Sequence, residues 1–450
     1  MQNQGFKNII NALIFSVIYS LLCVFILFTF AGCHKTPTKA QIDLTQSDIV
    51  ESAESATQKD SIKKDFSQKD SSPSKIDSKT KQESKKCNAP SPKTSALLSF
   101  VGDNVLGDYK GASGDTFNAK FREINGDFAY FSNGVREVLG SDDLTIGNME
   151  GVLSDRELKN AFEKPFSFKG QSSYTQVLRE ASIEALNLAN NHSRDYGAQG
   201  FADTKEHLLN AGFYAFGEGI LSIAEVNGIK FGLAGHRGWN LGIKSQVAKE
   251  IAELKSMGAD FVIFTFHWGE EREHYPNAIQ KQLGRFSIDS GADMVVAHHP
   301  HVLQGIEHYK DKKIVYSLGN FIYGGAKNPN DKDTMIFQSL ILAFSSEEEA
   351  SEFATSFEHN ECLQKQWLAR FSQGEFIKSQ PRIGKSRHFV LLHNIVPASI
   401  SSSTTHNDYA PKIYKKNTPQ TAKSNNSTVQ SNNGYERIFN RLEQYSRNLR

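Results

Sequence analysis

Side chains that bind metals or transfer protons recur in this sequence directly after short apolar runs. Each run is typical of a buried strand and leads into an aspartate, a glutamate, an asparagine or a histidine. Carboxylate oxygens, amide oxygens and imidazole nitrogens together suit a divalent metal such as Mn, Fe or Zn, whereas a structural zinc site would favour cysteines. The candidate residues are Asp103, Glu150, Asn191, His192, His267, His299 and His301.

The apolar runs predict the elements that position these side chains. Strand-like runs alternate with helix-like segments between Ser95 and Pro397, and the helix-like segments end in glycine. This alternation predicts an α/β layered fold. Ligands of open α/β sheets bind beyond the carboxyl ends of the strands, so we expect the polar side chains to meet at one sheet edge. The expected strands are 96–102, 143–150, 183–190, 229–236, 261–269, 294–301 and 313–321.

Three helices and a later pair of strands complete the expected body. The helices are 201–212, 246–258 and 276–291. The runs 334–344 and 387–396 are expected to add antiparallel strands, with a polar, helical insertion between them.

The composition excludes some classes of protein. The chain has 450 residues, with 51 Lys and Arg against 50 Asp and Glu. A net charge of +1 argues against a nucleic-acid partner held by a global basic field. Its four cysteines, Cys23, Cys33, Cys87 and Cys362, form no closely spaced zinc or redox motif, so we expect no disulfide framework.

The N-terminus is predicted to direct the protein to a membrane. Residues 9–30 are almost wholly apolar and uncharged, and about 20 such residues can span a bilayer. Ala31 and Gly32 then precede Cys33, as in a bacterial lipoprotein signal, in which Cys33 would carry the lipid. The alternative is an uncleaved anchor, because the run exceeds the apolar core of an ordinary signal. Both alternatives predict a membrane-anchored protein whose body lies outside the cytoplasm, in the cell envelope.

Four regions follow from these patterns. Residues 1–33 form the signal or anchor, and residues 34–94, rich in Ser, Lys, Asp and Gln, are expected to be a disordered linker that buries too little surface to fold. Residues 95–399 form the folded domain. Residues 400–450 are a polar tail with a short C-terminal helix, predicted from the spacing of Ile438, Leu442 and Tyr445.

A series of motifs gives the chain a family resemblance. In order, the motifs are VGDNVLGDY, GNMEG, NLANNHSRDYGAQG, FHWGEE, GADMVVAHHPHVLQGIE and IVYSLGNFIYG. They resemble the CapA-type capsule-synthesis family, which is implicated in bacterial poly-γ-glutamate synthesis and is similar in fold to the calcineurin-like metallophosphoesterases. The resemblance covers about residues 95–324. It implies a four-layer α/β/β/α sandwich with its site at the strand ends.

The resemblance also implies roles for individual residues. Glu150 stands where the phosphoesterases have a bridging aspartate, and His192 matches a histidine that contacts substrate and acts as general acid. Asp195 can orient His192 by accepting its other ring proton. The phosphoesterases have a histidine where this chain has Val105, which leaves a two-metal site one ligand short. The implied metal ligands are Asp103, Glu150, Asn191, His267, His299 and His301.

Two functions remain open at this stage. The first is a metal-dependent hydrolase or transferase that acts on an anionic polymer outside the cytoplasm, cleaving a phosphoester or a γ-glutamyl amide. The second is a non-catalytic accessory subunit of a polymer synthesis or export complex with a vestigial metal site, which Val105 favours. A periplasmic binding protein would need a two-lobed repeat, and the sequence has none.

Overall fold

The computed structural model describes residues 87, 89–162, 164–371, 375–376, 384–416 and 426–449. All of them belong to a compact unit that spans Lys75–Arg450. The expected signal or anchor at 1–33, its Cys33, and most of the expected linker lie outside the described residues. Within the described part, every helix is too short or too polar to cross a bilayer.

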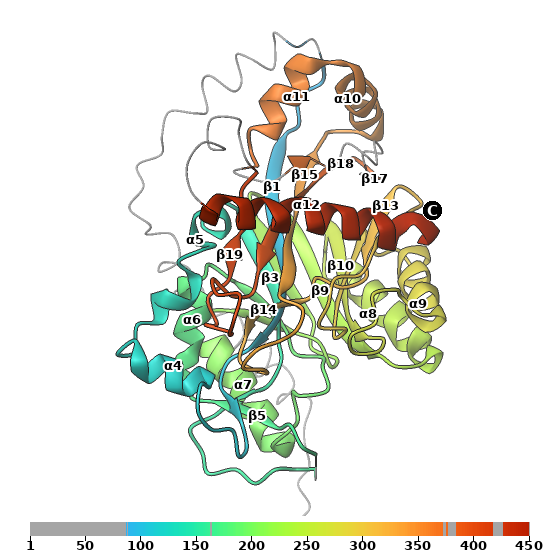
Figure 1. Ribbon diagram of the computed structural model, residues 1–450. Helices are drawn as coiled ribbons and strands as arrows, with labels where there is room; N and C mark the ends of the chain where they lie inside the picture. Colours follow the sequence, from blue (N-terminus) through green and yellow to red (C-terminus); the bar gives the residue numbers. More distant parts are fainter. Residues whose placement is uncertain are drawn as a thin grey trace, which may run out of the picture. The chain divides into compact units, whose positions relative to one another are not determined.

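The first large sheet is built around β1 (Thr94–Val105). β1 pairs in parallel with β3 (Leu144–Met149) and β14 (Asn320–Tyr323), and antiparallel with β15 (Asp333–Ala343). The strand order is β16-β18-β15-β1-β3-β6-β7, which places β1 at the centre (Figure 1). The other strands are β6 (Ala185–Asn187), β7 (Tyr214–Phe216), β16 (Glu375–Phe376), β17 (Gly384–Ser386), β18 (Phe389–Ser399) and β19 (Lys412–Ile413).

A second sheet has the order β12-β13-β11-β10-β9-β8. Its four central strands are parallel, and the outermost two are antiparallel to their neighbours. The strands are β8 (Ser222–Val226), β9 (Ile229–Gly238), β10 (Phe261–Trp268), β11 (Met294–His298), β12 (Ile306–Tyr309) and β13 (Lys312–Val315). A small third sheet contains β2 (Asp108–Tyr109), β5 (Phe168–Gly170) and β4 (Val152–Leu153).

Apolar side chains join the two large sheets. Phe100 of β1, Phe231 of β9 and Ile263 of β10 belong to one buried cluster, so the sheets pack face to face. Helices α4 (Phe117–Glu123), α5 (Arg136–Leu139), α6 (Thr175–Glu180) and α7 (Gly197–Asn210) contribute to a second cluster with strands of the first sheet. Helices α8 (Lys244–Ser256) and α9 (Ala278–Asp289) pack on the second sheet (Figure 1). The expected α/β fold is confirmed.

One expected strand is divided between the sheets. The run 313–321 forms β13, which pairs with β11 in the second sheet, and β14, which pairs with β1 in the first. The chain crosses between them through Gly319, whose φ of +74° is a left-handed conformation that favours glycine. Both halves are buried, so their hydropathy does not reveal the crossing.

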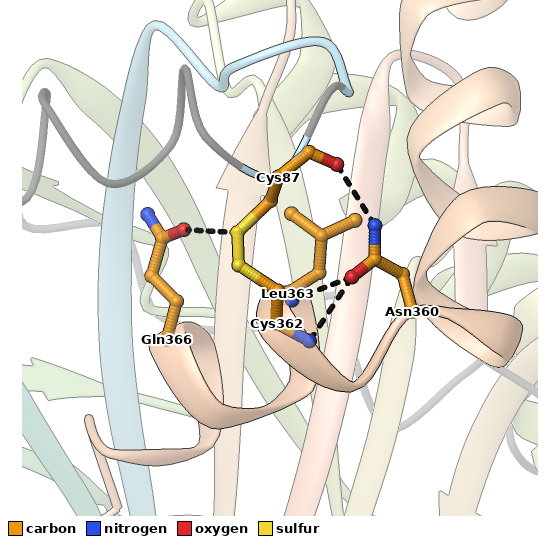
Figure 2. Close-up of a disulfide and its surroundings, with 5 residues drawn as sticks. All are labelled: Cys87, Asn360, Cys362, Leu363 and Gln366. Atoms are coloured by element: carbon orange, nitrogen blue, oxygen red, sulfur yellow. Dashed lines mark hydrogen bonds between the residues drawn. A yellow bond between two sulfur atoms is a disulfide. The ribbon is translucent and has the colours of Figure 1, made fainter.

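A disulfide joins Cys87 and Cys362, so the expectation of no disulfide was wrong (Figure 2). The two residues are 275 positions apart in sequence, with Cα atoms 5.7 Å apart. The pairing depends on the expected helical insertion, which forms α10 (Glu347–His359) and α11 (Glu361–Leu368). Asn360 begins α11: its Oδ1 accepts the N–H groups of Cys362 and Leu363, and its Nδ2 donates to the Cys87 carbonyl.

The expected C-terminal helix is α12 (Asn426–Ser446). Its Ile438, Leu442 and Tyr445 are buried in the same cluster that joins the two sheets. Arg437 pairs with the buried Asp333 at the start of β15, which fixes the helix on the body. Short 3₁₀ helices occur at Phe128–Ser132, Ser172–Tyr174, Leu241–Ile243 and Arg447–Leu449.

Candidate metal centre

The carboxyl ends of strands from both large sheets supply the polar side chains of the candidate site. In the first sheet, Asp103 of β1 lies opposite Asn148 of β3. In the second, His267 of β10 lies opposite His298 of β11. A glycine permits the close approach of β1 and β14, because a Cβ atom on Gly102 would lie 2.1 Å from the carbonyl oxygen of Gly319. The structure therefore places Asp103 and the histidines at one edge of the packed sheets.

The predicted ligands lie within a few ångströms of one another. His301 Nδ1 is 3.3 Å from Asp103 Oδ2, and His301 Nε2 is 3.8 Å from Glu150 Oε1. His267 Nε2 is 3.4 Å from Glu150 Oε1 and 2.7 Å from Asn191 Oδ1. Three groups have potential ligand atoms within 4.8 Å of one another: Glu150–His267–His299, Asp103–Glu150–His301 and Glu271–His299–His301.

The surroundings of the Glu150 carboxylate are the feature of this site that most directly indicates cation binding. Its side chain is fully buried, and neither carboxylate oxygen has a hydrogen-bond partner among the described residues. A buried carboxylate without a donor costs free energy, which a bound cation would offset. Together with Glu150 itself, the candidate ligands comprise two carboxylates, one amide oxygen and three imidazoles. These residues therefore fit a divalent metal such as Mn, Fe or Zn.

Burial and the charges of neighbouring groups shift the pKa values of the acidic residues and histidines of the site in different directions. Burial, with the nearby charge of Asp103, raises the pKa of Glu150 to about 7. Burial would also raise the pKa of Asp103, but the hydrogen bond and charge of His301 hold that pKa below its ordinary value. Burial opposes protonation of His301, yet Glu150 and Asp103 outweigh it and raise the His301 pKa to about 10. Without a cation, His301 thus carries the positive charge of the site.

The other two histidines among the candidate ligands favour their neutral form. Burial lowers the pKa of His267 well below its ordinary value, and that of His299 to about 2. The Nδ1 atom of His299 lies 3.0 Å from His267 Nε2. Neutral imidazole is the form that binds metals, so these residues are already prepared for a cation.

The backbone around the last two histidines is strained. His299 has a φ of +98° and His301 a φ of +57°, a region that residues other than glycine rarely adopt. The conformation is held in part by the N–H of His299, which donates to Asp103 Oδ2. Such strain is often found where side chains must be held in a functional geometry.

His192 and Asp195 form a dyad beside the ligand group. The Nδ1 atom of His192 lies 2.8 Å from Asp195 Oδ2, and its Nε2 atom lies 4.0 Å from Glu150 Oε1. Asp195 is fully buried and also accepts the N–H of Phe168 at 2.8 Å. Asp195 therefore occupies the position needed to orient His192, with Nε2 directed toward the ligands.

Several residues at the site were not singled out from the sequence. His298 Nδ1 lies 3.4 Å from Asp103 Oδ1, and Asn320 Oδ1 lies 2.8 Å from His301 Nδ1. Both occur in strand-end motifs, which could have identified them. Lys164, which pairs with Asp195, lies in a loop without any such signal. Val105, where the phosphoesterases have a histidine, is buried and apolar.

Comparison with known proteins links this site to a family. Residues 97–324 match the model of a family described as bacterial capsule synthesis protein PGA_cap. The chain is 32% identical over 249 residues to the PGA biosynthesis protein CapA of Bacillus subtilis (strain 168), covering 50% of this chain and 62% of that protein. It is also 32% identical over 220 residues to the capsule biosynthesis protein CapA of Bacillus anthracis, covering 43% and 54%.

A more distant relative is a probable polyglutamine synthesis accessory protein of Mycobacterium tuberculosis, 26% identical over 213 residues. The match covers 40% of this chain and 55% of that protein. The chain thus spans less than two thirds of the length of each of these three relatives.

Proposed function

Because this chain belongs to the family of bacterial capsule synthesis proteins, we propose that it acts in the synthesis of a capsule or poly-γ-glutamate-type polymer. We place it there as a metal-dependent hydrolase or transferase whose substrate is an anionic polymer. The names of the two Bacillus relatives support the process. The observation that carries the chemistry is the buried Glu150 carboxylate, which faces converging histidines and lacks a hydrogen-bond donor among the described residues.

The proposed ligands are Asp103, Glu150, Asn191, His267, His299 and His301. The chemistry that Mn, Fe or Zn supplies when bound is Lewis acidity, which lowers the pKa of a water molecule and polarises a phosphoryl or carbonyl oxygen. The ligand set serves a phosphoester and a γ-glutamyl amide equally. The side chains nearby therefore decide which bond is cleaved.

His192 is the proposed general acid. Asp195 accepts a hydrogen bond from its Nδ1, which leaves Nε2 directed at the ligand group, where the imidazolium form can give its Nε2 proton to a leaving group and become the neutral Nδ1–H form. Lys164 pairs with Asp195 and donates to the Asn191 carbonyl at 3.1 Å. This ion pair fixes the position of the Asp195 carboxylate beside the imidazole.

We also propose that the layers are ordered α/β/β/α and that the protein is tethered to the membrane with its body in the cell envelope. The separate apolar clusters that join helices to each sheet support the layer order. The disulfide supports the location, because disulfides form and persist in oxidising compartments. The tether itself, through Cys33 or an uncleaved anchor, rests on the sequence pattern alone.

A non-catalytic accessory subunit of a synthesis or export complex is the second candidate. Val105 favours it, because a fully assembled two-metal site would need a ligand where this chain has an apolar side chain. The mycobacterial relative carries the word accessory in its name. In this case the ligand group would bind metal weakly or not at all.

Metal analysis combined with activity assays separates the two candidates. The purified full-length protein is analysed for Mn, Fe and Zn and then assayed with a phosphodiester and with poly-γ-glutamate. The enzyme proposal predicts bound metal and cleavage of one of these substrates. It also predicts that His192→Asn lowers kcat by about 10²–10⁴-fold with metal content unchanged. Absence of metal under every loading condition would favour the accessory subunit.

A further inference from the structure

A cavity of about 1030 Å³ lies beside the His192–Asp195 dyad. It is bounded by β2, by residues 158–162 and 164, and by Tyr196 just before α7. Lys164 connects the two places, because it lines the cavity while its Nζ pairs with Asp195 and lies 3.4 Å from His192 Nδ1. A ligand held in this cavity would therefore be adjacent to the proposed general acid.

The cavity is positively charged. Among the residues that the structure describes, Lys110, Lys159, Lys164 and Lys169 line it, together with one carboxylate, Asp108. Lys110 and Lys159 are exposed and form no ion pair with any residue that the structure describes. Among the described residues, the Lys169 ammonium donates to one backbone carbonyl, that of Arg156, at 2.8 Å, and lies 5.9 Å from the centroid of the Tyr196 ring. Lys164 pairs with Asp195, but the other three lysines have no ion pair with a carboxylate among the described residues, and their combined potential attracts an anionic ligand.

Aromatic side chains lead from the cavity to His192. Tyr109, which lines the cavity, packs edge-on against Phe166 with ring centroids 5.1 Å apart. Phe166 stacks on Phe168, and the Phe168 ring lies 4.5 Å from the ring of His192. Phe166 and the lining residue Phe162 are 48% and 58% exposed. Large aromatic side chains left exposed in this way often mark a binding surface.

From these features we propose that the cavity binds a segment of the anionic polymer and presents it to the dyad. This inference rests on the proposed function, and it adds the residues that recognise the polymer. The lysine ammonium groups pair with charges repeated along the polymer, as point charges that need no fixed geometry. The aromatic faces contact the methylene groups between those charges. A small monovalent substrate would leave most of the cavity and its charge unused.

The test is a charge-neutralised triple variant compared with a matched control. In the full-length protein, Lys110→Gln, Lys159→Gln and Lys169→Gln remove three cavity charges and leave Lys164 and the dyad in place. The control carries Lys230→Gln, Lys249→Gln and Lys281→Gln. These changes remove the same charge from β9 of the second sheet and from α8 and α9, which pack on that sheet. Fluorescence anisotropy with labelled poly-γ-glutamate, at low and at raised salt, gives the Kd of each protein.

We expect the cavity variant to raise the Kd about tenfold or more, and the control to change it less than twofold. Equal weakening by both variants, or an unchanged Kd in the cavity variant, would overturn the inference. So would a cavity variant that binds the polymer normally but no longer binds vesicles rich in phosphatidylglycerol. A protein that binds the polymer through the cavity but never cleaves it would leave this inference standing and would instead contradict the proposed catalysis.

Discussion

The two ends of β1 are built in opposite ways. Its amino end lies near the Cys87–Cys362 disulfide, where Phe353 and Trp367 of the α10–α11 pair pack in an apolar cluster. Its carboxyl end carries Asp103, next to Glu150, whose oxygens have no hydrogen-bond partner among the described residues. The backbone there is also left-handed at two histidines. One strand thus joins a cross-linked apolar region to a polar and strained one.

This contrast indicates where the molecule gains stability and where it gives stability up. Apolar packing and a cross-link at one end stabilise the sheet. Buried charges and strained backbone at the other end destabilise it, and such features persist only when the surrounding structure holds them in place. We therefore expect changes at the polar end to alter metal binding, and changes at the cross-linked end to alter stability while leaving metal binding unchanged.

The largest effect is expected from removing a ligand at the polar end. Asp103→Asn takes away one of the two buried carboxylates and should lower the affinity for Mn²⁺ or Zn²⁺ by about 10²-fold or more, because the remaining ligands lose a charged partner. Isothermal titration calorimetry measures the change. The metal-free variant should also melt at a lower temperature than the metal-free wild type, because Asp103 pairs with His301 and accepts the N–H of His299. A variant that binds metal as tightly as the wild type would show that Asp103 is no ligand.

The second largest effect is expected on stability, from removing the disulfide near the amino end of β1. Cys87→Ser with Cys362→Ser should lower the free energy of unfolding by about 2–5 kcal/mol, since the unfolded chain gains the freedom that the cross-link removed. Denaturant titration of the oxidised wild type and the variant measures this. Metal affinity should be unchanged, because the disulfide lies at the other end of β1 from the ligands. Loss of metal along with stability would mean that the two ends are not independent.

A third expectation concerns pH. A cation must displace the proton on His301, whose pKa is about 10, and below about pH 7 also the proton on Glu150. Metal affinity should therefore rise with pH, by about tenfold per pH unit between pH 7 and 9 and more steeply below pH 7. Calorimetry in buffers of different ionisation enthalpy should detect close to one released proton at pH 8. A flat pH profile would exclude His301 as a ligand.

The smallest expected effect is on the free energy of unfolding. It tests whether the buried charge of Glu150, which has no hydrogen-bond partner among the described residues, destabilises the protein. Glu150→Gln removes a buried charge, so the metal-free variant should be more stable than the metal-free wild type by about 1 kcal/mol at pH 8. Chemical denaturation with a chelator present measures the difference. A matched Glu348→Gln variant at the exposed start of α10 should show no comparable gain. Destabilisation by Glu150→Gln would mean that the carboxylate has a structural partner.

The sequence identified the elements of the fold better than their connections. Strands such as 229–236 and 261–269 appear as β9 and β10, because period and length mark a buried strand locally. The split of 313–321 between two sheets was missed, because both halves are equally apolar. The Cys87–Cys362 pair was missed for a related reason: it depends on the fold that brings two distant segments together.

The candidate ligands could be predicted because parallel strands end at the same edge. Asp103 and Glu150 follow from that rule within the first sheet, whereas His267 lies in the second sheet and joins them through the family resemblance; the structure brings the three together. Lys164 could not be found in this way, because its role comes from a loop that reaches across to Asp195. The lysine-lined cavity is also assembled from separate loops, so only the folded chain reveals it.

The central claim is that strand ends from both sheets build one metal centre. Anomalous X-ray diffraction from crystals of the full-length protein grown with Mn²⁺ tests this most directly. We expect an anomalous peak from Mn²⁺ about 2.0–2.6 Å from an oxygen of Glu150 and from nitrogens of at least two of His267, His299 and His301. A protein saturated with Mn²⁺ that shows no peak there, or a peak only at another site, would contradict it.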